Sequence, residues 1–176
     1  MEPEIAKLIA GVGALLAAAG PFAHSVIGII GVVLLLVGLI SLADFYGDQS
    51  MRSDAVYWFI FAVIALIVLA AGGAMGVLSI GALMSGHFFA SIISIVGLIV
   101  VLVIAWIFYL MSARRFRNIM TAMAKKSGEG LFETAGTLYY WGAVLTIILV
   151  GAILLLIAFI LAGVAFLVMK TPAKSQ

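Results

Sequence analysis

Three long stretches of this 176-residue chain contain no Asp, Glu, Lys or Arg, and they restrict its fold more than any other feature. They run from residue 8 to 43, from 55 to 113 and from 134 to 169. A transmembrane helix needs about 20 consecutive apolar residues. Charged residues make up 9% of the chain, against roughly 25% in soluble domains. We therefore expect an all-α integral membrane protein, built as a polytopic helical bundle.

Turn residues divide two of these stretches into shorter predicted helices. Gly20-Pro21 interrupts the first stretch, because proline cannot continue a helix, and a Gly- and Ser-rich connector at 77–87 interrupts the second. The third stretch lacks such residues, which favours one long helix over a hairpin around Gly151. We expect one membrane domain with five transmembrane helices, or six if the hairpin forms. The predicted helices cover residues 4–19, 26–46, 55–76, 88–112 and 134–169.

A basic segment, residues 113–126, follows the predicted helix at 88–112. Its apolar residues fall at i, i+3, i+4 and i+7, which makes one stripe of a helix. We expect an amphipathic helix that lies in the membrane interface and contacts anionic headgroups. The segment is a candidate interface for lipid or for a protein partner, and the alternative is a simple topology anchor. The basic residues are Arg114, Arg115, Arg117, Lys125 and Lys126, and the stripe consists of Phe116, Ile119, Met120 and Met123.

Basic residues also predict the orientation of the chain in the cell membrane. The segment 113–136 holds five Lys and Arg residues against two acidic ones, so we expect it in the cytoplasm together with the N-terminus. Five helices would place Lys170 and Lys174 outside. Six helices would place every charged cluster on the cytoplasmic side. Charge therefore favours six helices, whereas turn chemistry favours five.

Two polar motifs and one apolar segment carry a resemblance. The first motif, at residues 42–48, reads Leu-Ala-Asp-Phe-Tyr-Gly-Asp, and the second, at 126–136, reads Lys-Ser-Gly-Glu-Gly-Leu-Phe-Glu-Thr-Ala-Gly. Together with residues 142–166 they resemble an archaeal membrane-protein family that is catalogued only as a domain of unknown function. The resemblance implies an archaeal cell-membrane protein. It implies no activity, cofactor or catalytic residue.

Small residues recur at the spacing used for close helix packing. Ala10, Ala14 and Ala18 lie one turn apart in the first predicted helix, and Gly72 and Gly76 do so near the end of the third. This pattern lets helix backbones approach closely within lipid. We expect these residues to pack helices within the chain, and the alternative is that they drive oligomerisation.

Four titratable residues are candidate metal ligands. Glu129 and Glu133 stand at i, i+4, but acidic residues in the first turn of a helix usually complement its dipole. His24 and His87 fall in predicted turns on the outer side. Two imidazoles without a nearby acid or Cys make a poor metal site. We therefore expect no metal.

Several classes of protein are excluded by composition. The absence of Cys excludes disulfides and thiolate metal sites, and a net charge of +2 is too small for a nucleic-acid partner. No catalytic triad or phosphate-binding motif occurs, so we expect no catalytic residue and no cofactor. No ionisable side chain lies in the predicted middle of a helix, which argues against an ion-coupled carrier.

Three hypotheses for function remain. The first is a non-catalytic protein that acts through contacts with lipid or protein, as an accessory subunit of a membrane complex or an oligomeric membrane-organising protein. The second is a small solute or ion channel or transporter formed by oligomerisation. The third is an enzyme acting on lipids, in which Asp44, Asp48 and Asp54 would hold a divalent cation.

Overall fold

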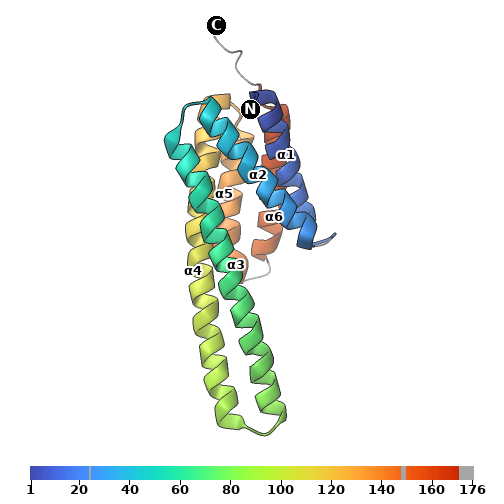
Figure 1. Cartoon of the computed structure of the whole chain (residues 1–176), viewed down its shortest axis with the longest axis vertical. Coiled ribbons are helices and arrows are strands. Elements are labelled where there is room, and N and C mark those ends of the chain that lie inside the picture. Colours follow the sequence, from blue (N-terminus) through green and yellow to red (C-terminus); the bar gives the residue numbers. More distant parts are fainter. Residues whose placement is uncertain (24, 148–149, 171–176) are drawn as a thin grey trace. The chain divides into compact units, whose positions relative to one another are not determined.

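The structure is a computed structural model, and it describes residues 1–23, 25–147 and 150–170. Within these residues the chain forms α-helices and one short 3₁₀ helix, with no strand (Figure 1). Four helices, α2, α3, α4 and α6, are long and apolar enough to cross a membrane. The expected all-α membrane protein is confirmed. The elements are α1 (Pro3–Ala19), α2 (Ser25–Phe45), α3 (Gln49–Met84), α4 (Phe88–Ser127), α5 (Leu131–Val144), η1 (Leu145–Ile147) and α6 (Val150–Val168).

Contacts between helices group the chain into two units. The bundle unit comprises Met1–Phe59 and Ala113–Gln176, and the hairpin unit comprises Ile60–Ser112. The bundle unit therefore contains α1, α2, α5 and α6, together with the first turns of α3 and the last turns of α4. The hairpin unit contains the remainder of α3 and α4.

Glycine brings α1 and α2 of the bundle unit into backbone contact. A Cβ atom on Gly13 would collide with the backbone of Leu35, and one on Gly31 would collide with the backbone of Ala17. The small residues of α1 serve the same packing, since a Cβ on Gly38 would lie 2.6 Å from the Cβ of Ala10. The predicted packing residues Ala10, Ala14 and Ala18 are all buried.

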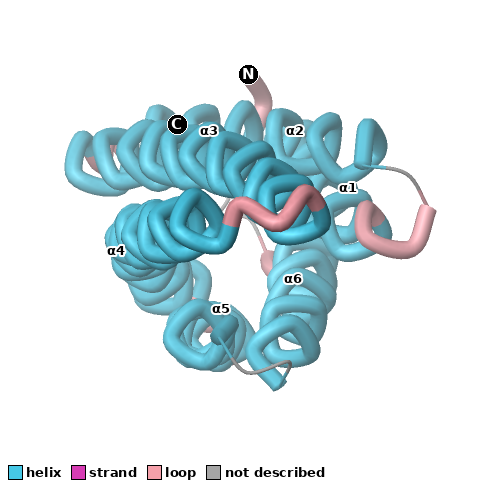
Figure 2. Tube along the Cα trace, turned by 90° about the horizontal axis from the view of Figure 1, so that it is seen from below, coloured by secondary structure: helices cyan, strands magenta, loops and turns pink. Residues whose placement is uncertain are grey.

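Helix α6 lies beside both α1 and α5 (Figures 1 and 2). Gly11 and Gly163 face each other, because a Cβ on either would lie 3.2 Å from the carbonyl oxygen of the other. Lys7 of α1 donates a hydrogen bond from Nζ to the carbonyl oxygen of Met169, at 3.2 Å. The first and last helices of the bundle unit are thus joined along their length and at one end.

Residues 134–169 do not form the single long helix that their lack of turn residues favours. Helix α5 ends at Val144, η1 follows, and α6 begins at Val150 and returns along α5. Glycine permits this reversal, since a Cβ on Gly142 would lie 3.0 Å from the nitrogen of Leu155, and one on Gly151 would lie 2.5 Å from the carbonyl oxygen of Gly142. The hairpin alternative therefore describes this part of the chain.

The segment 113–126 is the last part of α4 rather than a separate interfacial helix. Its apolar stripe packs on protein, because the Phe116 ring lies 5.2 Å from Trp58, 4.4 Å from Tyr139 and 6.0 Å from Phe159, centroid to centroid. The structure therefore differs from the expected separate helix in the membrane interface. An apolar stripe of a helix packs against an apolar surface, and here other helices provide that surface. The stripe residues Phe116, Ile119, Met120 and Met123 are fully buried.

In the hairpin unit a tight turn joins α3 to α4. Helix α3 continues past its predicted end at residue 76. Gly86 has φ +76°, a left-handed conformation that glycine adopts without strain. The predicted packing residues Gly72 and Gly76 face α4, where their Cβ atoms would lie 3.1 Å from Val101 and 3.8 Å from Leu98. In this unit they pack helices within the chain.

Candidate functional site

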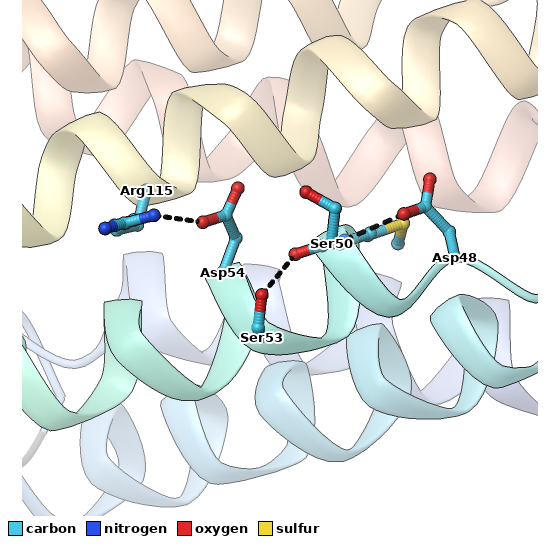
Figure 3. Close-up of polar contacts among 6 residues, drawn as sticks. Asp48, Ser50, Ser53, Asp54 and Arg115 are labelled. Carbon is cyan, nitrogen blue, oxygen red and sulfur yellow. Dashed lines mark hydrogen bonds and ion pairs between the residues drawn. The ribbon is translucent and has the colours of Figure 1, made fainter.

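The turn between α2 and α3 is built by glycine and an aspartate cap. Gly47 has φ +63°, and the Asp48 N–H donates to the carbonyl oxygen of Ala43 at 2.9 Å, closing α2. The Asp48 carboxylate then accepts a hydrogen bond from the Met51 N–H at 2.9 Å and caps α3 (Figure 3). The polar motif at residues 42–48 therefore ends α2 and begins α3.

Asp48 also binds the end of α4. Its Oδ2 lies 3.0 Å from Nζ of Lys126, and that ammonium lies 5.4 Å from the centre of the Tyr46 ring. The Met51 N–H and the Lys126 side chain hold the pKa of Asp48 below its ordinary value. One carboxylate thus connects three elements, α2, α3 and α4.

Asp54 forms a second link between α3 and α4. Its Oδ1 lies 2.7 Å from Nη1 of Arg115 (Figure 3), and only 11% of its side chain is exposed. The Arg115 guanidinium also lies 5.3 Å from the centre of the Tyr57 ring. The buried carboxylate is therefore neutralised by a guanidinium that an aromatic face helps to hold.

The three aspartates proposed as a cation site do not converge on one point. Asp44 pairs with Arg52 at 3.3 Å, and each of the other two has its own base, as described above. Within the described part of the chain, no group of three or more His, Cys, Asp or Glu residues is arranged to hold a metal ion. The acidic residues of this region act as partners for arginine and lysine.

Three of the five predicted interface bases remain without a carboxylate partner within the described residues. Arg114, Arg117 and Lys125 line a groove of about 670 Å³ on the bundle unit. Arg117 lies 5.6 Å from the centre of the Tyr140 ring on α5, which forms part of the groove wall. Arg115 and Lys126 are the two bases that aspartates engage, and the Asp48–Lys126 pair also lines the groove.

The groove follows one face of α4. Residues 114, 118, 121 and 125 succeed one another at i, i+4, i+7 and i+11, so the lining extends about 16 Å at 1.5 Å per residue. Arginine guanidinium groups bind phosphate or carboxylate through two parallel hydrogen bonds. An excess of unpaired cations beside amide and hydroxyl groups therefore suits an anion. The polar residues that complete the lining are Asn118, Thr121 and Tyr140.

Sequence reasoning missed these three polar residues, although two of them carry a signal in the sequence. Asn118 and Thr121 continue the helical spacing of Arg114 on the face opposite the apolar stripe. Tyr140 carries no such signal, because it reaches the groove from α5, a helix that only the folded chain places beside α4.

Within the described part of the chain, no other candidate residue lines the groove. Glu129 precedes Gly130, the N-cap residue of α5, and accepts a hydrogen bond from the Leu131 N–H at 3.3 Å. His87 lies in the turn of the hairpin unit, where its N–H donates to the carbonyl oxygen of Ala82. His24 and Lys174 lie outside the described residues.

Comparison with known proteins gives a family and no activity. A family described as "Protein of unknown function (DUF996)" matches residues 27–160, which include the acidic turn and the whole groove. An uncharacterized protein from the archaeon Methanocaldococcus jannaschii is 26% identical over 180 residues, which cover 100% of this chain and 98% of that protein. No solved structure matches. The resemblance carried by the polar motifs is thereby confirmed, and the chain belongs to the DUF996 family.

Proposed function

We propose that this protein is a non-catalytic integral protein of the cell membrane that acts by binding anionic lipid headgroups in the groove on α4. The observation that carries the proposal is the set of three bases, Arg114, Arg117 and Lys125, that line one groove without carboxylate partners within the described residues. Each Lys or Arg near an anionic leaflet contributes about 1 kcal/mol of binding free energy. Three together favour anionic over zwitterionic lipid.

Such a protein would serve as an accessory subunit of a membrane complex or as an oligomeric membrane organiser. Support comes from the hairpin unit, whose helices carry large exposed apolar side chains that a protein partner would cover. Examples that are more than half exposed are Ile67, Val77, Leu78 on α3 and Phe89, Ile93, Val96 on α4.

The proposed orientation places the groove mouth in the cytoplasm. Lys7 bonds to Met169 at the end of α6, and Lys170 is the next residue. Lys126 precedes α5, whose Phe132 ring packs 4.7 Å from that of Phe166 near the same end of α6. Basic residues gathered at one end favour the cytoplasmic side.

A small anion channel or transporter, formed by oligomerisation, is the second candidate. The observation that favours it is the continuous polar lining of the groove along α4 from Lys126 to Arg114. This candidate predicts chloride or phosphate flux into protein-containing liposomes, and the flux should fall when Thr121 is enlarged to Phe. Absence of flux for both anions would remove it.

The lipid proposal is tested by native mass spectrometry of the purified protein after equilibration with phosphatidylglycerol or phosphatidylcholine. The triple variant Arg114→Gln, Arg117→Gln, Lys125→Gln should retain less phosphatidylglycerol than the wild type. The control Arg52→Gln removes a cation outside the groove and should retain the wild-type amount. Equal retention by the triple variant and the control would refute the proposal. The same spectra give the mass of the intact particle and so its oligomeric state.

A further inference from the structure

The depth of the groove follows from its position beside α6. Helix α6 has 19 residues, all apolar, and spans about 28 Å, close to the roughly 30 Å of a bilayer's hydrocarbon core. Phe159 is its middle residue, and the rings of Phe159 and Phe116 lie 6.0 Å apart. Phe116 of α4 is therefore level with the middle of α6, a helix that is long and apolar enough to cross a membrane.

Arg114 and Arg117 flank Phe116 and share this depth. Lys126 lies ten residues beyond Phe116 on α4, about 15 Å away along the helix axis. Lys126 lies at about the same depth as the end of α6. This follows because Phe132, in the first turn of the next helix, packs on Phe166 near the end of α6. The groove thus runs from one membrane surface, at Lys126, to about mid-depth, at Arg114.

Cations at this depth require water or a counter-ion, because a charged side chain is costly in hydrocarbon. The neighbouring Arg115 has its counter-ion in Asp54. Arg114 and Arg117 have no carboxylate partner within the described residues and face the groove instead. A volume of about 670 Å³ holds many waters at roughly 30 Å³ each, or a headgroup with part of its hydration.

We propose that Arg114 and Arg117 form a hydrated site that binds the phosphate of an anionic lipid at mid-bilayer depth, well below the headgroup plane. The headgroup enters at the Asp48–Lys126 end, passes Lys125 and is held by the two guanidinium groups. Tyr140, beside the Arg117 guanidinium, restricts the direction in which that group points. This site rests on the proposed function. It adds that the lipid phosphate lies deep in the bilayer, which lipid binding at the membrane surface does not require.

The first experiment measures depth and hydration with single cysteines, since the chain contains none. A charged thiol reagent is applied to both sides of proteoliposomes that carry Asn118→Cys in the groove, Lys125→Cys near its mouth, or Ile160→Cys. Ile160 is 41% exposed on α6 at a depth similar to that of Asn118 and serves as the matched lipid-facing control. We expect rapid labelling of the two groove cysteines and none of the control.

Two outcomes of this labelling would overturn the site. If Lys125→Cys reacts and Asn118→Cys does not, the groove is closed at depth, while lipid binding at its mouth, and with it the proposed function, survives. If Ile160→Cys reacts as fast as Asn118→Cys, this part of the bundle unit lies outside the bilayer, and the site is not intramembrane.

The second experiment identifies the occupant. Labelling of Asn118→Cys should be roughly tenfold slower in phosphatidylglycerol than in phosphatidylcholine vesicles, as expected if each of two bases contributes about 1 kcal/mol or somewhat less. Adding Arg114→Gln and Arg117→Gln should abolish the difference, whereas adding Arg52→Gln should preserve it. Protection by millimolar inorganic phosphate in phosphatidylcholine vesicles, equal to that by phosphatidylglycerol, would assign the site to a free anion and overturn the lipid assignment.

Discussion

The Arg115 guanidinium and the Asp54 carboxylate lie 2.7 Å apart, although 61 residues separate them in the sequence. The pair joins the first turns of α3 to the last turns of α4 within the bundle unit. The carboxylate is almost entirely buried, whereas the guanidinium side chain is 42% exposed. Loss of the base would therefore leave a carboxylate with little access to water, the costly half of a broken ion pair.

Removal of this pair should destabilise the protein more than removal of a surface pair. We expect Arg115→Gln to lower the unfolding free energy by about 1–3 kcal/mol, less than for a fully buried pair because one partner is exposed. The control Arg52→Gln breaks the exposed pair with Asp44 and should cost about 0–1 kcal/mol. Thermal unfolding in detergent measures both. The double variant Asp54→Asn, Arg115→Gln should cost less than the sum of the single changes, and strict additivity would contradict the coupling.

Stability should fall in acid because of Asp48. Its pKa is lowered in the folded protein, so the folded state binds the proton more weakly than the unfolded state does. The stabilisation is fully present above the unfolded pKa, about 4, and is lost as pH falls through the lower folded value. The melting temperature of the wild type should therefore drop below about pH 4 more steeply than that of Asp48→Asn. Asparagine retains the cap and carries no charge, so parallel acid profiles would contradict this assignment.

The contact between α1 and α2 should be intolerant of a single methyl group. Gly31→Ala would push a Cβ atom into the backbone of Ala17, although alanine is the better helix former by about 1 kcal/mol. We expect a lower melting temperature. Gly81→Ala in α3 is the matched control, because its Cβ would meet no atom within 4 Å and should leave stability unchanged or raise it. Equal melting temperatures for the two variants would show that the helices separate freely.

Single cysteines should also report which ends of the bundle unit share a side of the membrane. Glu133→Cys lies at the start of α5 and Lys170→Cys just after α6, and both residues are exposed. An impermeant thiol reagent should label both from the same side of sealed vesicles. Phe22→Cys, between α1 and α2, should be labelled only from the opposite side. Labelling of Glu133→Cys and Lys170→Cys from opposite sides would contradict the returning hairpin of α5 and α6.

The sequence is a good guide to the helices that polar residues delimit. Gly20-Pro21 and the acidic motif around Asp48 separate α1, α2 and α3, because proline, left-handed glycine and a capping carboxylate act within a few residues. The bounds of α1 and α2 lie within one residue of the prediction, whereas α3 begins at Gln49, six residues before its predicted start. The reversal between α5 and α6 escaped this reasoning. It relies on contact between Gly142 and Gly151, a tertiary interaction for which the sequence shows only two glycines among nineteen.

The sequence predicts which basic residues belong to the candidate site, but not where the fold places them. Five basic residues of α4 are evident in the sequence, but their division into paired and unpaired bases depends on Asp48 and Asp54, which lie more than 60 residues away. The apolar stripe that includes Phe116 fits lipid and protein equally well by periodicity alone. Only the folded chain shows that it packs on other helices, and so places the bases beside the middle of α6.

The facing glycines of α1 and α6, Gly11 and Gly163, have a consequence for biosynthesis. Helix α1 is translated early, but its partner surface on α6 does not exist until some 150 further residues have been made. During that interval α1 can pack on α2 alone, with its α6-facing glycine side open to lipid or to an insertion chaperone. Closure of the bundle unit is therefore a late event, and a ribosome stalled before residue 150 would leave an open, protease-sensitive intermediate.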